Sequence, residues 1–401
     1  MISAPPLLHT NTKICEERTM NKLFYPSEKQ ADMFAGTSIE APEYLSEQLI
    51  TYIGNKRKLL PMIESSLIQA ISELGIEKPT FADVFAGTGV VSRMARSYAN
   101  RLFINDFEEY SSYSNQVYHV NRRSVPVEEI EYWRHQVNQA GAKGEALGFI
   151  TELYAPANED AITTDDRVFY TRRNAAFIDS ARAEINKAPQ HIQPFLLAPL
   201  LQRASVHVNT SGVFKGFYKN KLGVGQFGGT MKNALSRITA EIEIPFPVFS
   251  RHEREVKVSC MDAADFINDI SEIDIAYFDP PYNQHPYGSN YFMLNLILKN
   301  ERPQGISKIS GIPNAWQRSP YNTRSKAGPA LAKIVHDCPA KALLISYNSE
   351  GFITPDEMMS ILGPIGEVQV FDQLYNTFRG CRNLSDRSTH VTEMLFKVVR
   401  S

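Results

Sequence analysis

The chain has 401 residues, of which 43% are hydrophobic and 21% charged, values typical of a folded globular protein. This length corresponds to about two to three domains, or to one large α/β domain with an insertion. No run of about 18 apolar residues is present, so we expect no transmembrane helix. The N-terminus lacks the basic and apolar parts of a signal peptide. Four widely spaced cysteines fit a reducing cytoplasm and argue against a structural zinc site.

A net charge of −2 excludes a protein that binds nucleic acid by being basic throughout. The charge is unevenly placed, however. Residues 185–240 (the first basic segment) hold seven Lys or Arg and no acid, and residues 302–336 (the second basic segment) hold six and no acid. Two such segments on an otherwise acidic chain predict a localised surface for a polyanion. Two solvated loops are the alternative interpretation.

Residues 1–45 show little periodicity, and we expect a poorly ordered extension there. Apolar residues then recur at helical spacing, which predicts a helix after Arg57 (Leu59, Leu60, Ile63, Leu67, Ile71). A buried strand over 80–85, a helix over 90–98 and a second strand over 101–105 follow. Strand, glycine turn, helix and strand form a βαβ unit, so the sequence predicts an α/β fold with a parallel sheet.

This alternation is lost between about 145 and 250, where we expect a helix over 194–203 and a Gly-rich loop over 221–229. It resumes with strands at 255–260, 273–278 and 341–346, helices at 266–270, 289–299 and 355–362, a basic loop over 301–327, and final strands near 366–371 and 391–399. We therefore expect a catalytic domain formed by 46–144 and 251–401, with an inserted region at 145–250.

The strongest chemical signal is Asp279-Pro280-Pro281-Tyr282, directly after the strand expected at 273–278. Ligands of open α/β sheets bind beyond the carboxyl ends of the strands. Methylation of an aromatic amine needs acceptors that favour a pyramidal nitrogen and offset its developing charge, and the Asp279 carboxylate and Pro280 carbonyl can provide them. The prolines stiffen the turn, and Tyr282 can stack on a base pulled from a duplex. A Pro-Pro turn with a surface acid is the alternative.

A nucleoside site is predicted at the turn Asp83-Val-Phe85-Ala-Gly87-Thr-Gly89. Its glycines permit close approach of the backbone to a nucleoside at a helix start, although a tight strand–helix connection would also need them. Asp106 follows the next strand, where an acid can accept both ribose hydroxyls. Ser92 stands where a pyrophosphate-binding fingerprint would have glycine, which disfavours a nicotinamide dinucleotide.

Two further segments are candidates for the same site. Within residues 51–59 (TYIGNKRKL), cations crowd a helix start, which the helix dipole disfavours, so a bound anion would justify one of them. Flexible surface lysines are the alternative. Asp262 follows the strand at 255–260 and can either face the adenine amino group of a cofactor or cap the next helix.

In this order, the motifs resemble those of the Dam-like, alpha-type adenine-specific DNA methyltransferases, from about Tyr52 to Val399. The resemblance implies a Rossmann-like, S-adenosylmethionine-dependent methyltransferase sheet with a target-recognition region at 145–250. It also implies that Tyr52, where some members have tryptophan, and Lys56 contact the cofactor. Tyr291 and residues 346–348 are similar to the family as well. The complete candidate cofactor site is Tyr52, Lys56, Asp83, Phe85, Gly87, Gly89, Asp106, Asp262 and Asp279, and the candidate catalytic residues are Asp279, Pro280, Pro281 and Tyr282.

We therefore expect a site-specific enzyme that transfers a methyl group from S-adenosylmethionine to the amino group of adenine in duplex DNA after base flipping. The resemblance suggests the modification enzyme of a restriction-modification system, with a cognate restriction endonuclease. We expect a cytoplasmic monomer with no metal and no membrane partner. The residues expected to contact DNA are Lys215, Lys219, Lys221, Arg318, Arg324 and Lys326.

Alternatives from other classes fit the residues less well. A protein-glutamine or cytosine-amino methyltransferase would share the fold but prefers Asn or Ser before Pro-Pro. A nicotinamide oxidoreductase is disfavoured by Ser92 and leaves Asp279–Tyr282 unexplained. A DNA-binding module without catalysis would keep the basic segments but need not keep Asp279 and Tyr282.

Overall fold

The computed structural model of the protein describes residues 40–229, 231–376 and 390–400. The expected extension over 1–45 therefore lies mostly outside the described residues. Its last part is ordered, since Pro42–Ser46 form helix α3 and Tyr44 is fully buried. The Tyr44 hydroxyl donates to the carbonyl of Tyr118 at 2.9 Å, and the Arg93 guanidinium donates to the carbonyl of Tyr44. Long-range contacts of this kind leave no periodic pattern in the sequence.

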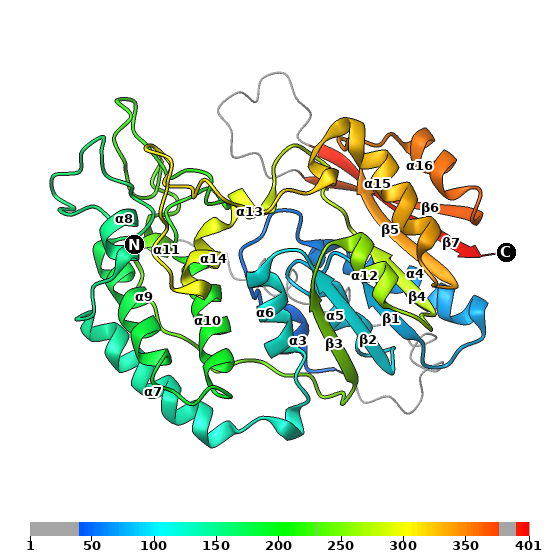
Figure 1. The fold of residues 1–401 in the computed structure, drawn as a ribbon, viewed down its shortest axis with the longest axis horizontal. Helices are drawn as coiled ribbons and strands as arrows, with labels where there is room; N and C mark the ends of the chain where they lie inside the picture. The colour runs from blue at the N-terminus through cyan, green and yellow to red at the C-terminus, as the bar shows by residue number, and fades with distance from the viewer. Residues whose placement is uncertain (1–39, 230, 377–389, 401) are drawn as a thin grey trace, which may run out of the picture.

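A seven-stranded sheet forms one half of the molecule, in the order β3-β2-β1-β4-β5-β7-β6 (right in Figure 1). Strands β1 to β5 pair in parallel, and β7 runs antiparallel between β5 and β6. The predicted α/β class and Rossmann-like sheet are confirmed. The strands are β1 (Thr80–Asp83), β2 (Arg101–Asp106), β3 (Glu255–Cys260), β4 (Ile275–Phe278), β5 (Ala342–Asn348), β6 (Gly366–Asn376) and β7 (His390–Arg400).

Helices cover both faces of the sheet and create two apolar cores. One core joins the sheet to α12 (Ala263–Asp269), α15 (Arg324–Asp337) and α16 (Pro355–Leu362). The other joins it to α4 (Leu60–Leu74) and α5 (Val90–Ala95). In β4, Ala276 and Phe278 belong to the first core and Ile275 and Tyr277 to the second, as the alternation of side chains along a strand requires.

The other half of the molecule is helical and has a third apolar core (left in Figure 1). Residues 145–250 contribute much of this core, together with α7, which precedes them, and α14, which follows much later in the chain. Its helices are α6 (Glu109–Tyr118), α7 (Val127–Lys143), α8 (Phe149–Tyr154), α9 (Arg172–Ile185), α10 (Gln193–Val206), α11 (Leu235–Thr239), α13 (Tyr287–Asn290) and α14 (Phe292–Lys299).

Short 3₁₀ helices complete the fold at Lys56–Leu59 (η2), Arg122–Ser124 (η3) and Pro320–Asn322 (η4). Within the described ranges, no helix has the length and apolar character needed to cross a membrane.

Two of the expected elements take a different form in the structure. The helix expected over 289–299 is interrupted at Tyr291 and forms α13 and α14. Residues 324–327 were assigned to a basic loop, but they begin α15, whose buried stripe is Ala327, Leu331, Ile334 and Val335. The loop prediction was wrong there because Gly328 and Pro329 are poor helix formers and obscure that stripe.

Candidate active site

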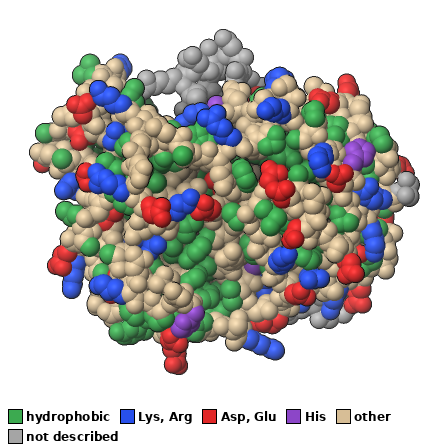
Figure 2. All heavy atoms as spheres, viewed as in Figure 1, with side chains coloured by type: hydrophobic (Ala, Val, Ile, Leu, Met, Phe, Trp, Pro, Cys, Tyr) green, Lys and Arg blue, Asp and Glu red, His purple; other side chains and the backbone are tan. Residues whose placement is uncertain are grey.

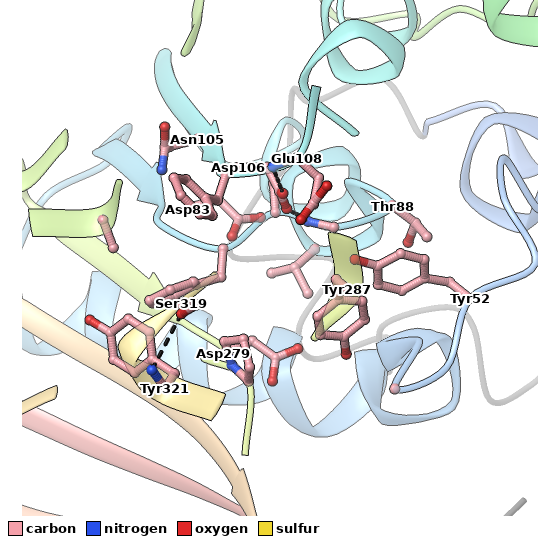
Figure 3. A pocket seen from close by; sticks show the side chains of 18 of the residues that line it. Tyr52, Asp83, Thr88, Asn105, Asp106, Glu108, Asp279, Tyr287, Ser319 and Tyr321 are labelled. Carbon is pink, nitrogen blue, oxygen red and sulfur yellow. Dashed lines mark hydrogen bonds between the residues drawn. The ribbon is translucent and has the colours of Figure 1, made fainter. Parts of the chain in front are cut away.

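A cavity lies at the carboxyl ends of the parallel strands. The strand order reverses between β1 and β4, and such a switch point opens a crevice in a parallel sheet. Asp83 ends β1, Asp106 ends β2 and Asp279 follows β4, and all three line the cavity (Figure 3). Three carboxyl groups from distant parts of the sequence therefore meet at one site.

The structure brings most of the predicted cofactor residues to this cavity. Gly89 has another position: it precedes α5 in the left-handed conformation, and a Cβ atom there would lie 1.9 Å from the Asn115 side chain. Asp262 caps α12 by accepting from the Ala264 N–H at 2.9 Å, and it also lines the cavity. The predicted residues that line the cavity are Tyr52, Lys56, Asp83, Phe85, Gly87, Asp106, Asp262, Asp279 and Pro281.

Backbone amides orient the Asp106 carboxylate. The Gly87 N–H donates to Oδ2 at 2.6 Å and the Glu108 N–H donates to Oδ1 at 2.8 Å. Burial raises the pKa of Asp106, and these amides oppose that effect. Gly87 has a φ of 52°, and a Cβ atom there would lie 3.2 Å from the Tyr52 ring. A fixed carboxylate beside a glycine turn is suited to the hydroxyls of a ribose.

Two other carboxyl groups of the cavity are weak acids because they are buried. Burial raises the pKa of Asp83 to about 7 and the pKa of Glu108 to about 8. Asp83 accepts from the Ser92 hydroxyl through Oδ2, while Oδ1 has no hydrogen-bond partner among the described residues. Glu108 accepts from Asn295 at 3.1 Å. With Asp106, Asp262 and Asp279 as further lining acids, the cavity suits a positively charged ligand.

Two stacked tyrosines, Tyr52 and Tyr287, line one side of the cavity (Figure 3), and Tyr291 packs against both rings. The Tyr52 ring stacks on Tyr287 with centroids 4.9 Å apart and on Tyr291 with centroids 4.6 Å apart. The Tyr291 hydroxyl accepts from the Ile53 N–H at 2.7 Å. The segment before η2 is thereby joined to the junction of α13 and α14. Tyr287 was not singled out in the sequence, although tyrosines at 282, 287 and 291 lie close together there.

Lys56 and Asp279 form a buried ion pair. The distance from Lys56 Nζ to Asp279 Oδ1 is 3.0 Å, and the Lys56 side chain is 4% exposed. Burial raises the pKa of Asp279 to about 6, although Lys56 opposes that shift. Burial also opposes the charge of Lys56, but Asp279 and Glu393 outweigh it and raise the lysine pKa above its usual range.

The cation crowding at η2 is explained by this pair. The alternative of flexible surface lysines is wrong for Lys56, and the anion it meets is a carboxylate of the chain itself. Asn55 caps η2 by accepting from the Arg57 N–H at 2.8 Å, which fixes the start of the helix.

The rest of the tetrapeptide is held by its neighbours. Pro280 is buried. Tyr282 meets Tyr347 edge to face, with ring centroids 6.3 Å apart, and its carbonyl accepts from the Phe352 N–H at 3.0 Å. Tyr347 belongs to the segment 346–348, which resembles the family in sequence. The turn at Asp279 is therefore braced from the β5 side.

Both basic segments contact the chain close after the tetrapeptide, and the second also lines the cavity. In the first, Lys215 Nζ lies 3.3 Å from His285 Nδ1, close after the tetrapeptide. In the second, Ser319 and Tyr321 line the cavity and Asn322 donates to the carbonyl of Asn283 at 2.8 Å (Figure 3). Both segments therefore contact the loop that follows Asp279.

The cations predicted to bind DNA are exposed or partly exposed. Lys219 lies over the Phe217 ring, Arg318 over Trp316 and Arg324 over Phe352, at 4.6 to 4.9 Å from the ring centroids. Other cations of the segments have partners within the protein: Arg237 donates to backbone carbonyls, and Arg302 pairs with Glu152 at 2.6 Å. Cations and acids are interspersed on the face shown in Figure 2.

Sequence reasoning missed several residues of the site. Glu108 lies two residues after Asp106, so the position next to a strand-end acid was the available signal. Ser319 and Tyr321 lie in a segment considered only for its charge. Glu393 of β7 lies 3.6 Å from Lys56, and no local motif marks it.

Fold and site together are those of a Rossmann-like transferase, with a cavity at the switch point whose lining carboxylates can accept hydrogen bonds from a ligand. The chain belongs to the D12 class N6 adenine-specific DNA methyltransferases, whose family model matches residues 52–361. The family expected from the sequence motifs is thus confirmed.

Curated relatives support this membership. The type II methyltransferase M.NlaIII of Neisseria lactamica is 28% identical over 370 residues, which are 86% of this chain and 100% of the relative. The type II methyltransferase M.CviAII of Paramecium bursaria Chlorella virus 1 is 28% identical over 361 residues, 87% of this chain and 98% of the relative. The modification methylase StsI of Streptococcus sanguinis is 27% identical over 372 residues, 87% of this chain and 52% of the relative.

Proposed function

We propose that this DNA methyltransferase takes its methyl group from S-adenosylmethionine and places it on N6 of an adenine that has left the duplex. One observation carries the proposal: the ion-paired Asp279 carboxylate lines the same cavity as Asp106 and the Gly87 turn. A carboxylate that can accept a hydrogen bond from an amino group therefore lies next to a site suited to a nucleoside.

The cavity residues fit the cofactor. Asp106, held by two amides, would accept the ribose hydroxyls, and the absence of a side chain at Gly87 leaves room for a nucleoside beside Tyr52. The acids of the lining suit the positive charges of S-adenosylmethionine. When bound, the cofactor supplies an electrophilic methyl group.

The chemistry assigned to the chain centres on Asp279. Its carboxylate accepts one N–H of the adenine amino group and the Pro280 carbonyl accepts the other, which favours a pyramidal nitrogen and offsets its developing positive charge. With a pKa of about 6, the carboxyl group is ionised at neutral pH. Lys56 holds its Oδ1 atom in place at 3.0 Å. Tyr282, braced by Tyr347, provides a stacking surface for the flipped base.

Duplex DNA is proposed to lie across the two basic segments. Both contact the loop that follows Asp279, through Lys215 and His285 on one side and Asn322 and Asn283 on the other. Exposed cations at these places neutralise phosphates and steer the duplex to the mouth of the cavity.

A restriction-modification role is proposed from the relatives. Two of them are named type II methyltransferases and a third a modification methylase. The expected partner is a restriction endonuclease that cuts the same DNA site unless this enzyme has methylated it.

The test is transfer of a tritiated methyl group from S-adenosylmethionine to duplex DNA by the full chain, followed by digestion to nucleosides. The label is expected in N6-methyl-2′-deoxyadenosine. Label in a cytosine would overturn the adenine assignment, and no label with this donor would overturn the proposed cofactor. The Asp279→Ala variant provides the background.

A further inference from the structure

Strand β7 places a buried carboxylate next to the Lys56–Asp279 pair. Glu393 is opposite Asn348 of β5 in the sheet register, and Asn348 Nδ2 donates to Glu393 Oε1 at 3.4 Å. Its Oε2 atom lies 3.6 Å from Lys56 Nζ and has no hydrogen-bond partner among the described residues. Glu393 is 6% exposed and follows the region 52–361 that the family model matches.

Glu393 occupies a position where an apolar side chain is expected. Its neighbours on β7, Met394 and Leu395, are buried in the two cores of the sheet, where an apolar side chain is the usual occupant. A carboxylate in such a place is costly unless it is paired, and the group it meets is Lys56. The buried Lys56 ammonium is therefore shared between two carboxylates, Asp279 after β4 and Glu393 on β7.

We propose that Glu393 is a positioning residue for methyl transfer, which acts through Lys56 to keep the Asp279 carboxylate available to the adenine amino group. This inference rests on the proposed role of Asp279 as the acceptor.

The physical argument concerns how the lysine charge is divided. Without Glu393, Lys56 would direct its whole charge at Asp279 and tighten the ion pair that it already makes with Oδ1 at 3.0 Å. With Glu393 ionised, the three groups carry a net charge of about −1, so the potential at the amino nitrogen stays negative as positive charge develops there. Glu393 also raises the pKa of Asp279, after burial and against the effect of Lys56.

Other ionisable groups act on this cluster from neighbouring elements. Asp83 at the end of β1 interacts with Asp279, and burial raises its pKa to about 7. Tyr277 of β4 and Tyr287 of α13 also interact with Asp279, and burial raises their pKa values well above 10. Tyr282 faces Lys56, Glu393, Asp279 and Glu350, and burial raises its pKa too. The tyrosines are thus neutral over the acid range.

The experiment follows single-turnover methyl transfer into duplex DNA across the acid limb of the pH profile. The wild-type rate should fall below about pH 6, where Asp279 becomes protonated. Glu393→Gln should move the midpoint to lower pH by about 0.5 to 1 unit. It should also lower the plateau rate by up to about tenfold, the equivalent of one pKa unit. Glu393→Asp, which keeps the charge but withdraws it by one methylene, should produce smaller changes in the same direction.

The matched control is Glu73→Gln. Glu73 of α4 pairs at 2.5 Å with Lys397, which lies on β7 like Glu393, and neither residue of this pair lines the cavity. It should leave the midpoint in place. KM values for DNA and cofactor should stay near wild type for Glu393→Gln, since the residue lies behind Lys56 rather than among the lining residues.

An unmoved midpoint with an unchanged plateau in folded Glu393→Gln would overturn the inference. If thermal denaturation shows that this variant does not fold, Glu393→Asp decides alone, and an unmoved limb there overturns it. A wild-type protein that places no methyl on adenine would instead contradict the proposed function. A wild-type acid limb that neither Glu393 variant moves contradicts the positioning role alone.

Discussion

The cavity and the basic segments carry charge in different ways. In the cavity, the main ionisable groups are largely buried and meet partners within the protein: Lys56 lies 3.0 Å from Asp279, and two amides hold Asp106. In the basic segments, cations such as Lys221 and Lys326 are exposed, and Arg302 of the second segment is engaged with Glu152. Buried charges interact strongly because little water screens them, whereas exposed charges are screened and act together. Single substitutions should therefore matter far more in the cavity.

Asp279→Ala tests this contrast where the largest effect is expected. Loss of the acceptor should lower the single-turnover rate by at least about 10² to 10³, because its effect appears as charge develops on the amino nitrogen. The fold and most of the DNA affinity should remain. The matched control is Asp269→Asn, which removes an exposed carboxylate paired with Lys257 and should leave the rate unchanged. Full activity in Asp279→Ala would contradict the proposed mechanism.

Asp106→Ala should produce the next largest effect, on cofactor binding. Charge-assisted hydrogen bonds to the ribose would be lost, so binding of S-adenosylmethionine should weaken by about 1.5–3 kcal/mol in calorimetry. Asp265→Ala is the control, because Asp265 is an exposed acid on nearby α12 that does not line the cavity. Equal affinities for wild type and a folded Asp106→Ala would remove Asp106 from the cofactor site.

The same contrast explains how much the sequence could predict. Strands β1, β2 and β4 are largely buried on both faces, so they appear as continuous apolar runs, and the acids at their carboxyl ends could be assigned to one sheet edge. The prediction that Asp83, Asp106 and Asp279 share one site depended on that rule together with the family resemblance of the motifs.

Contacts between distant segments could not be predicted in this way. Glu393 meets Lys56 only because β7 inserts antiparallel between β5 and β6, which no local pattern reveals. Helix α7 was missed because few of its residues are buried (Ile130, Val137 and Gly141) and its apolar stripe is weak. The cations of the basic segments could be counted, but their partners, such as Glu152 for Arg302, depend on the tertiary fold.

Tyr282→Ala should have a smaller effect, on capture of the flipped base. Removal of the stacking surface should weaken binding of the target adenine by about 1–3 kcal/mol and leave residual activity, while Tyr282→Phe should retain most of it. The measurement is KM for duplex DNA together with fluorescence of a 2-aminopurine placed at the target position. A loss of equal size in Tyr282→Phe would indicate that the hydroxyl, rather than the ring, carries the effect.

The smallest effects are expected in the basic segments, and salt is the variable that separates them from the cavity. Each exposed cation that neutralises a phosphate should contribute about −0.9 to the slope of log affinity against log salt concentration for duplex DNA. Lys215→Ala and Lys326→Ala should each make that slope shallower by about this amount and weaken binding to all sequences alike, because phosphate contacts carry no sequence information.

Arg302→Ala is the control within the second segment, since its guanidinium already pairs with Glu152, and its slope should equal that of the wild type. Filter binding over a salt series measures all four proteins. A salt-independent wild type would mean that both basic segments are solvated loops and that the duplex is held by other parts of the surface, whereas a shallower slope in Arg302→Ala would show that DNA displaces Glu152 from its partner.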